Sequence, residues 1–94
     1  MKGYQIENCQ TIANYYGKTS QILIAVEEMS ELTKELCKYR RNFERRKEII
    51  EEIADCQIML EQLIELFGIK REVSDMIDYK LERQIRRIEQ ERGE

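Results

Sequence analysis

Apolar residues recur at steps of three and four positions along almost the whole chain, and no proline interrupts them. This spacing places them on one face of an α-helix, because an α-helix turns once every 3.6 residues. Gly17 and Gly68 are the clearest stops, and a left-handed C-terminal cap is expected at Gly17. The pattern therefore predicts four helices, over residues 3–16, from Thr19 or Ser20 as N-cap to about Arg41, from a turn at 41–44 with Asn42 as N-cap to Phe67, and from about Glu72 to Gln90.

These helices predict an all-α fold, an antiparallel bundle of about four helices within a single domain over residues 1–94. Two long helices joined by a short connection are expected to pack as antiparallel neighbours. A chain of this length buries only somewhat more than about 60% of the surface of its unfolded state, so association would add stability. We therefore expect homo-oligomerisation, as a dimer or tetramer, to complete the bundle.

The charges and the hydropathy exclude several classes of partner. The 16 basic and 19 acidic residues are interspersed and leave a net charge of −3, which argues against nucleic-acid binding. The longest apolar run, at 22–26, is too short to span a bilayer, and the N-terminus lacks the apolar region of a signal peptide. We expect a soluble cytoplasmic protein with no membrane partner.

The chain contains no histidine, which removes the Ser–His and Cys–His pairs that most nucleophilic enzymes use. An enzyme built from this sequence must therefore work with carboxylates, basic residues and a metal. Cys9, Cys37 and Cys56 are widely spaced and fall on or near apolar stripes. They are predicted to be small core residues in a reducing compartment.

Two acidic pairs lie beside the apolar stripes of the second and third helices, Glu28 with Glu31 and Glu52 with Asp55. Four other acidic pairs share the three-residue spacing, so placement beside a stripe distinguishes these two. When the stripes pack together, both acidic flanks can face one cleft. Four carboxylate ligands would suit Mg²⁺, because hard cations prefer oxygen. The alternative is a solvated acidic flank that pairs with nearby lysines and arginines.

Lys80, Arg83 and Arg87 form a basic flank beside the apolar stripe of the fourth helix. A metal ion held by carboxylates, together with these basic residues, could bind a polyphosphate, because the metal and the basic side chains would neutralise its oxygens. The alternative is that the three residues form ordinary ion pairs within their own helix. The candidate partners for such pairs are Glu82, Glu89 and Glu91.

The two acidic segments resemble a known family. Glu27-Glu28-Met29-Ser30-Glu31, followed after twenty residues by Glu52-Ile53-Ala54-Asp55, is similar to the EExxE and ExxD signature of the MazG-like, all-α nucleoside triphosphate pyrophosphohydrolases. The similarity covers roughly residues 20–90, including the apolar runs beside both motifs and the region of Lys80 and Arg83.

The resemblance implies a Mg²⁺-dependent enzyme that hydrolyses a nucleoside triphosphate to the monophosphate and pyrophosphate. It makes Glu28, Glu31, Glu52 and Asp55 the expected metal ligands and catalytic residues, with Glu27 as a secondary catalytic candidate. The expected phosphate-binding residues are Lys80, Arg83 and Arg87.

The sequence departs from the family pattern in two respects. Ser30 stands where relatives often have glycine, and no tryptophan is present to stack on a base. A base-stacking wall would have to come from another aromatic residue or a neighbouring subunit. The candidates are Tyr15, Tyr16, Tyr39, Phe43 and Tyr79.

Other functions remain open at this point. One alternative is a non-catalytic helical interaction module with the same fold. Within the same superfamily, the alternatives are a phosphoribosyl-ATP pyrophosphatase-like enzyme and a dimeric dUTPase-like enzyme, although the chain is short for the latter.

Overall fold

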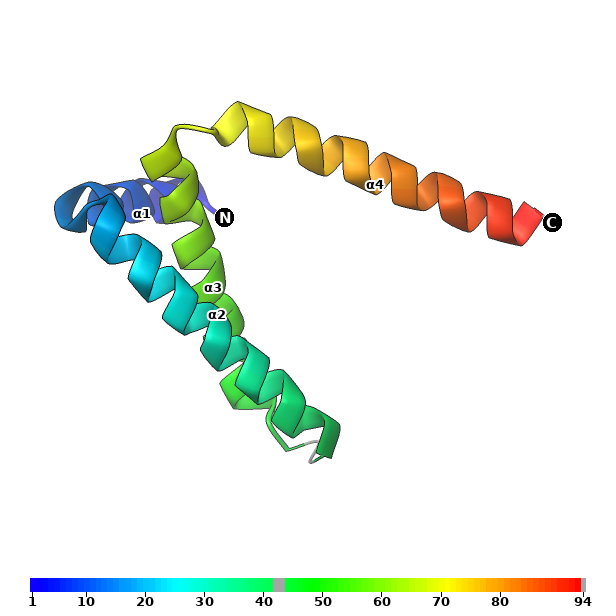
Figure 1. The fold of residues 1–94 in the computed structure, drawn as a ribbon, viewed down its shortest axis with the longest axis horizontal. Helices are drawn as coiled ribbons and strands as arrows, with labels where there is room; N and C mark the ends of the chain where they lie inside the picture. Colours follow the sequence, from blue (N-terminus) through cyan, green and yellow to red (C-terminus); the bar gives the residue numbers. More distant parts are fainter. Residues whose placement is uncertain (42–43, 94) are drawn as a thin grey trace.

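The computed structural model describes residues 1–41 and 44–93, and these residues form four α-helices (Figure 1). The predicted all-α class is therefore confirmed for this part of the chain. The helices are α1 (Gly3–Tyr16), α2 (Lys18–Arg41), α3 (Arg46–Phe67) and α4 (Lys70–Gly93).

The junction between α1 and α2 consists of Gly17 alone. Its φ of 88° is positive, but its ψ of 169° lies outside the left-handed helical region, so the predicted left-handed cap is wrong. The Gly17 N–H still donates to the Ala13 carbonyl at 2.8 Å. Because α2 already begins at Lys18, Thr19 and Ser20 lie inside its first turn, and neither is the predicted N-cap.

The ends of α3 also differ in their agreement with the prediction. Gly68 adopts the left-handed conformation, with φ 63° and ψ 41°, and ends the helix as its spacing indicates. The following N–H, of Ile69, donates to the Ile64 carbonyl at 3.2 Å. Arg45 is the N-cap of α3. Asn42, the predicted N-cap, lies outside the described residues, as does Phe43.

Helices α2 and α3 pack against each other as the predicted antiparallel neighbours, and α1 packs mainly on α3 (Figure 1). We call residues 18–67, which contain α2 and α3, the arm. Helix α4 leaves the end of the arm and extends away from it, and among the described residues it contacts only α3. The radius of gyration is 16.5 Å, whereas a compact domain of this length has about 12 Å.

The core contains mostly small side chains. The buried hydrophobic residues of the described chain are Cys9, Ala13, Ala25, Cys56 and Met59. Small residues such as Ala25 and Cys56 let two helices approach closely, but they remove little apolar surface from water. The largest side chain that is fully buried is an amide, Gln62, which accepts a hydrogen bond from Gln21 Nε2 at 2.8 Å.

Helix α2 does not turn the centre of its apolar stripe towards α3. Its buried residues are Gln21, Ala25 and Glu35, while Val26 and Met29 on the stripe are exposed. The helix is therefore rotated towards its acidic side. Cys37 is also exposed, so the prediction that it is a core residue is wrong, whereas Cys9 and Cys56 are buried as predicted.

A partly buried ion pair lies at the end of the arm, near the connection between its helices. The Arg45 guanidinium donates to both carboxylate oxygens of Glu35, at 2.9–3.0 Å, and Lys38 Nζ lies 3.5 Å from the same carboxylate. This bidentate contact joins α2 to the residue that caps α3. None of the helices described is both long and apolar enough for a membrane span.

Candidate metal centre

The rotation of α2 brings its acidic side against α3 in the middle of the arm. Glu28 of α2 meets Glu52 and Asp55 of α3, which lie one turn apart on their helix. One oxygen from each of the three carboxylates lies within 4.8 Å of the others. We call these residues the carboxylate cluster. They could hold a metal ion, as the acidic spacing on two packed helices indicates.

The negative charges of the three carboxylates lie close together, and the side chains around them do not fully balance these charges. A side-chain hydrogen bond with Asp55 is the main reason that the pKa of Glu28 is raised above its ordinary value. Desolvation and the charges of Asp55, Glu52 and Glu31 raise it further. Without a cation, the Glu28 carboxyl therefore keeps its proton to a higher pH than usual, because its negative charge is unfavourable beside these acids.

Glu52 is half-buried and places one buried carboxylate oxygen in the cluster. Burial is the largest cause of its raised pKa, and the nearby charges of Asp55 and Glu31 add to it. Its Oε2 atom is buried without a hydrogen-bond partner among the described residues. A buried carboxylate oxygen without a partner is costly, and a bound cation would remove this cost. The all-oxygen donor set suits a hard cation such as Mg²⁺ or Ca²⁺.

Cys56 supports the backbone behind the cluster. Its thiol donates to the carbonyl oxygen of Glu28 at 3.4 Å and so joins α3 to α2 directly. Burial, followed by the charges of the three clustered carboxylates, raises the pKa of this thiol. Cys56 therefore remains a neutral donor and takes no part in the metal-ligand set.

The other two acids of the first motif lie outside the cluster. Glu31 is half-exposed and forms an ion pair with Lys34 at 3.6 Å, although its charge still acts on Glu28 and Glu52. Glu27 is exposed, as expected for a residue almost opposite the apolar stripe. Three of the four predicted metal ligands are therefore brought together, and Glu31 lies nearby with a different partner.

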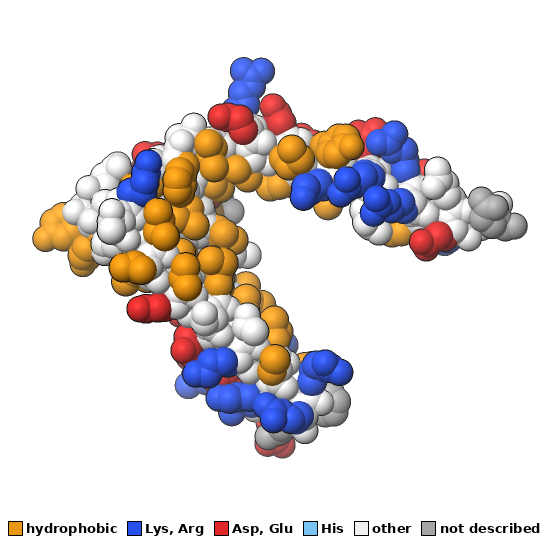
Figure 2. All heavy atoms as spheres, in the orientation of Figure 1, with side chains coloured by type: hydrophobic (Ala, Val, Ile, Leu, Met, Phe, Trp, Pro, Cys, Tyr) orange, Lys and Arg blue, Asp and Glu red, His pale blue; other side chains and the backbone are white. Residues whose placement is uncertain are grey.

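The predicted basic flank lies elsewhere in the molecule. Lys80, Arg83 and Arg87 are on α4, which runs away from the middle of the arm, and Figure 2 shows basic side chains along the lower side of this helix. Within the described residues they make no ion pair with Glu82, Glu89 or Glu91. Arg83 instead lies over the ring of Tyr79, 5.5 Å from its centroid.

Three of the candidate aromatic residues have ring contacts away from the cluster, Tyr15, Tyr16 and Tyr79. Tyr15 and Tyr16 lie at the end of α1 and contact each other edge to face, with ring centroids 4.8 Å apart. Tyr79 lies on α4 beneath Arg83, and Phe43 is outside the described residues.

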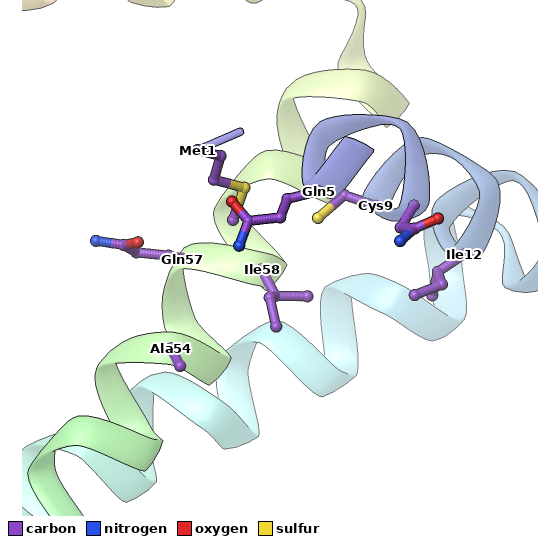
Figure 3. A pocket seen from close by; sticks show the side chains of 8 residues that line it. Met1, Gln5, Cys9, Ile12, Ala54, Gln57 and Ile58 are labelled. Atoms are coloured by element: carbon purple, nitrogen blue, oxygen red, sulfur yellow. The ribbon is translucent and has the colours of Figure 1, made fainter. Parts of the chain in front are cut away.

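A separate pocket of about 310 Å³ lies between α1 and α3 (Figure 3). Its α3 residues, Ala54, Gln57 and Ile58, occupy a different face of the helix from Glu52 and Cys56, so the pocket and the carboxylate cluster are distinct features. Polar amides and apolar side chains line it together. The lining residues are Met1, Gln5, Asn8, Cys9, Ile12, Ala54, Gln57 and Ile58.

Two contacts that position the cluster had no clear signal in the sequence. The Gln21–Gln62 hydrogen bond and the Glu35–Arg45 ion pair tie α2 to α3 on either side of the carboxylates. Glutamine and arginine are common surface residues, so nothing in their type marks them as partners. Glu35 lies on the same flank as Glu28 and Glu31, and this position is the one indication that it faces α3.

Comparison of this chain with protein-family models, with curated proteins and with solved structures gives no match. The description of the site therefore depends on the carboxylate geometry and on the motif spacing.

Proposed function

We propose that this chain is a Mg²⁺-dependent nucleoside triphosphate pyrophosphohydrolase of the MazG-like type, which releases pyrophosphate and a nucleoside monophosphate. The observation that carries the proposal is that Glu28, Glu52 and Asp55 meet, and that a buried oxygen of Glu52 has no hydrogen-bond partner in the described part of the chain. These three residues come from the two motifs that resemble the family signature, at the predicted positions.

The proposed site residues come from two parts of the chain, one that would bind the metal ion and one that would bind the phosphates. Glu28, Glu52 and Asp55 would hold Mg²⁺, with Glu31 as an additional ligand once it leaves Lys34. When bound, Mg²⁺ would stabilise the charge that develops on the phosphoryl oxygens and lower the pKa of the attacking water. A carboxylate of the first motif, including Glu27, could accept the proton that this water loses.

Lys80, Arg83 and Arg87 would neutralise the remaining phosphate oxygens. Within one copy they lie on α4, away from the cluster, so their use at the same site requires α4 of another copy. Homo-oligomerisation is therefore part of the proposed function.

The decisive experiment is a pyrophosphate-release assay with a panel of canonical and modified triphosphates in Mg²⁺. We expect turnover of at least one of them, and a loss of about 100-fold or more in kcat for Glu52→Gln and for Asp55→Asn. The fold of each variant is checked by circular dichroism.

The chain offers a matched control, because Glu72 and Asp75 on α4 have the same spacing as Glu52 and Asp55 but lie outside the cluster. Glu72→Gln and Asp75→Asn should keep nearly full activity. Equal losses in both pairs of variants, or no turnover of any triphosphate, would contradict the proposal. In the latter case the non-catalytic interaction module becomes the better description.

A further inference from the structure

The chain exposes much more surface than a compact protein of its size. Its accessible surface is 7735 Å², whereas a folded monomer of 11.4 kDa exposes about 5,800 Å². The excess is about 1,900 Å² per chain. Large apolar side chains account for much of what is exposed, while the core is built from alanine, cysteine and one methionine.

The exposed apolar residues form two uncovered stripes. The first runs along the arm and consists of five residues that are 36–54% exposed, Ile22, Val26, Met29, Ile53 and Leu60. At about 100° per residue, and with α2 and α3 antiparallel, these positions fall on the same face of the helix pair.

The second uncovered stripe runs along α4. Its residues Ile77, Leu81, Ile85 and Ile88 are 38–60% exposed, and no part of the described chain packs over them. In Figure 2, hydrophobic side chains line the inner side of the angle between α4 and the arm. An amphipathic helix of this kind is stable when its apolar stripe is covered.

We propose that a second copy of this chain covers both stripes, with α4 of each copy lying on the arm of the other. The area supports a second copy over a small transient partner. Two copies that each bury the excess surface would together remove about 3,800 Å², which is typical of obligate homodimers and well above the standard interface of about 1,600 Å².

The charges favour α4 on the arm over α4 on α4. Residues 18–67 carry eight basic and eleven acidic residues, whereas residues 70–93 carry seven basic and six acidic residues. Lys80, Arg83 and Arg87 lie beside the α4 stripe and make no ion pair within the described chain. Reciprocal packing therefore sets a basic flank against an acidic arm, and a two-fold axis makes the same contact twice. The proposed function also uses α4 of another copy, but this arrangement follows from the exposed apolar stripes and the charges alone.

Sedimentation equilibrium of the full chain tests the association. We expect a dimer, or a multiple of it, at micromolar concentration, because an interface of this size holds obligate partners together. The double variant Leu81→Gln/Ile85→Gln should raise the dissociation constant at least about 100-fold. Val26→Gln/Met29→Gln, on the arm, should act in the same direction. Tyr15→Gln is the control, because Tyr15 is 81% exposed on α1 but belongs to neither stripe.

A crosslinking measurement on the otherwise unchanged chain tests the arrangement without relying on variants that could unfold. A photoreactive residue replaces Leu81, and isotopically heavy and light copies are mixed. Crosslinks between heavy and light copies should join position 81 to residues 18–67. A monomer at 50 µM would overturn the proposal. Unchanged association of both stripe variants, or heavy–light crosslinks confined to α4, would also overturn it, because another surface would then hold the copies together. Loss of enzymatic turnover alone leaves this result unaffected, so failure of the proposed function is separately visible.

Discussion

The α2–α3 arm and α4 are built from helices of similar length, 24 and 22 residues in the arm and 24 in α4, yet their surroundings differ. In the arm, Gln62 and Glu35 are buried and bind Gln21 and Arg45 across the helix pair, and Glu52 is half-buried beside Glu28. In α4 no residue is buried, and the side chains of the apolar stripe are exposed. The same helical periodicity therefore has two outcomes, a packed pair that positions carboxylates and a single helix that still needs a partner.

The largest difference in stability should appear when the same residue type is removed from each region. Gln62→Ala in the arm leaves Gln21 without its hydrogen-bond partner and creates a cavity, so we expect a loss of about 2–4 kcal/mol. Gln90→Ala, on the exposed face of α4 opposite its apolar stripe, should change the free energy of unfolding by less than about 0.5 kcal/mol. Urea denaturation measures both, and similar losses would show that this outer face of α4 is packed as tightly as the arm.

The two junction glycines should respond differently to a side chain. Gly17, within the packed part, has positive φ with extended ψ, a region almost restricted to glycine, so Gly17→Ala should cost about 1–3 kcal/mol. Gly68, before α4, is left-handed helical, where alanine costs only about 1 kcal/mol. A Cβ meets no atom within 4 Å at either site, so backbone strain alone sets both effects. Thermal unfolding of the two variants checks this order.

The ion pairs of the two regions offer a pH test. The Arg45 guanidinium lowers the pKa of Glu35 below its ordinary 4.5, so this pair stabilises the fold above that pH and loses its contribution as the pH falls through the lowered pKa. Glu35→Gln should therefore lower the melting temperature by several degrees at pH 7 and by less near pH 3. Asp75→Asn removes the exposed 3.9 Å pair with Arg71 on α4 and should have almost no effect at either pH. Equal effects would contradict the difference in burial.

The carboxylate cluster is the part of the arm that opposes folding when no cation is bound. Because the pKa of Glu52 is raised above 4.5, its destabilising effect grows as the pH rises through the raised pKa and is complete above it. Glu52→Gln should therefore raise the melting temperature by a few degrees at pH 7 without metal, and by nothing near pH 4. Mg²⁺ should stabilise the wild type and not the variant. Glu72→Gln on α4 is the control, and a variant that responds to Mg²⁺ as the wild type does would argue against the metal centre.

Much of the fold could be predicted from periodicity and the glycines. The first helix has the expected limits, Phe67 ends the third, and Gly68 stops it in the left-handed conformation. The rotation of α2 could not be predicted, because a broad apolar stripe does not reveal which half is covered. The small side chain of Ala25 and the Arg45–Glu35 contact favour packing of the acidic side of α2 against α3. Both effects arise only when α3 is in place, so the sequence of α2 alone does not reveal them.

The site could be predicted in part for the same reason. Motif spacing correctly indicated that Glu28, Glu52 and Asp55 lie together, because one helical turn separates the two α3 acids and α2 packs alongside. It did not indicate that Glu31 forms an ion pair with Lys34, because Glu31 could equally have faced the cluster. Nor could it show that Lys80 and Arg83 lie on a helix that runs away from the cluster, because the direction of α4 depends on its junction with α3 and not on its own sequence pattern.

Only Gly68 and Ile69 separate α3 from α4. A small rotation at this short connection would therefore displace the far end of α4 by a large distance. A 24-residue helix is about 36 Å long, so a rotation of 10° at the joint carries its far end through about 6 Å. Glu28, Glu52 and Asp55 lie on the other side of that joint and keep their spacing throughout such a swing. A change in a few backbone torsions at this joint would therefore move the basic residues of α4 and leave the carboxylates in place.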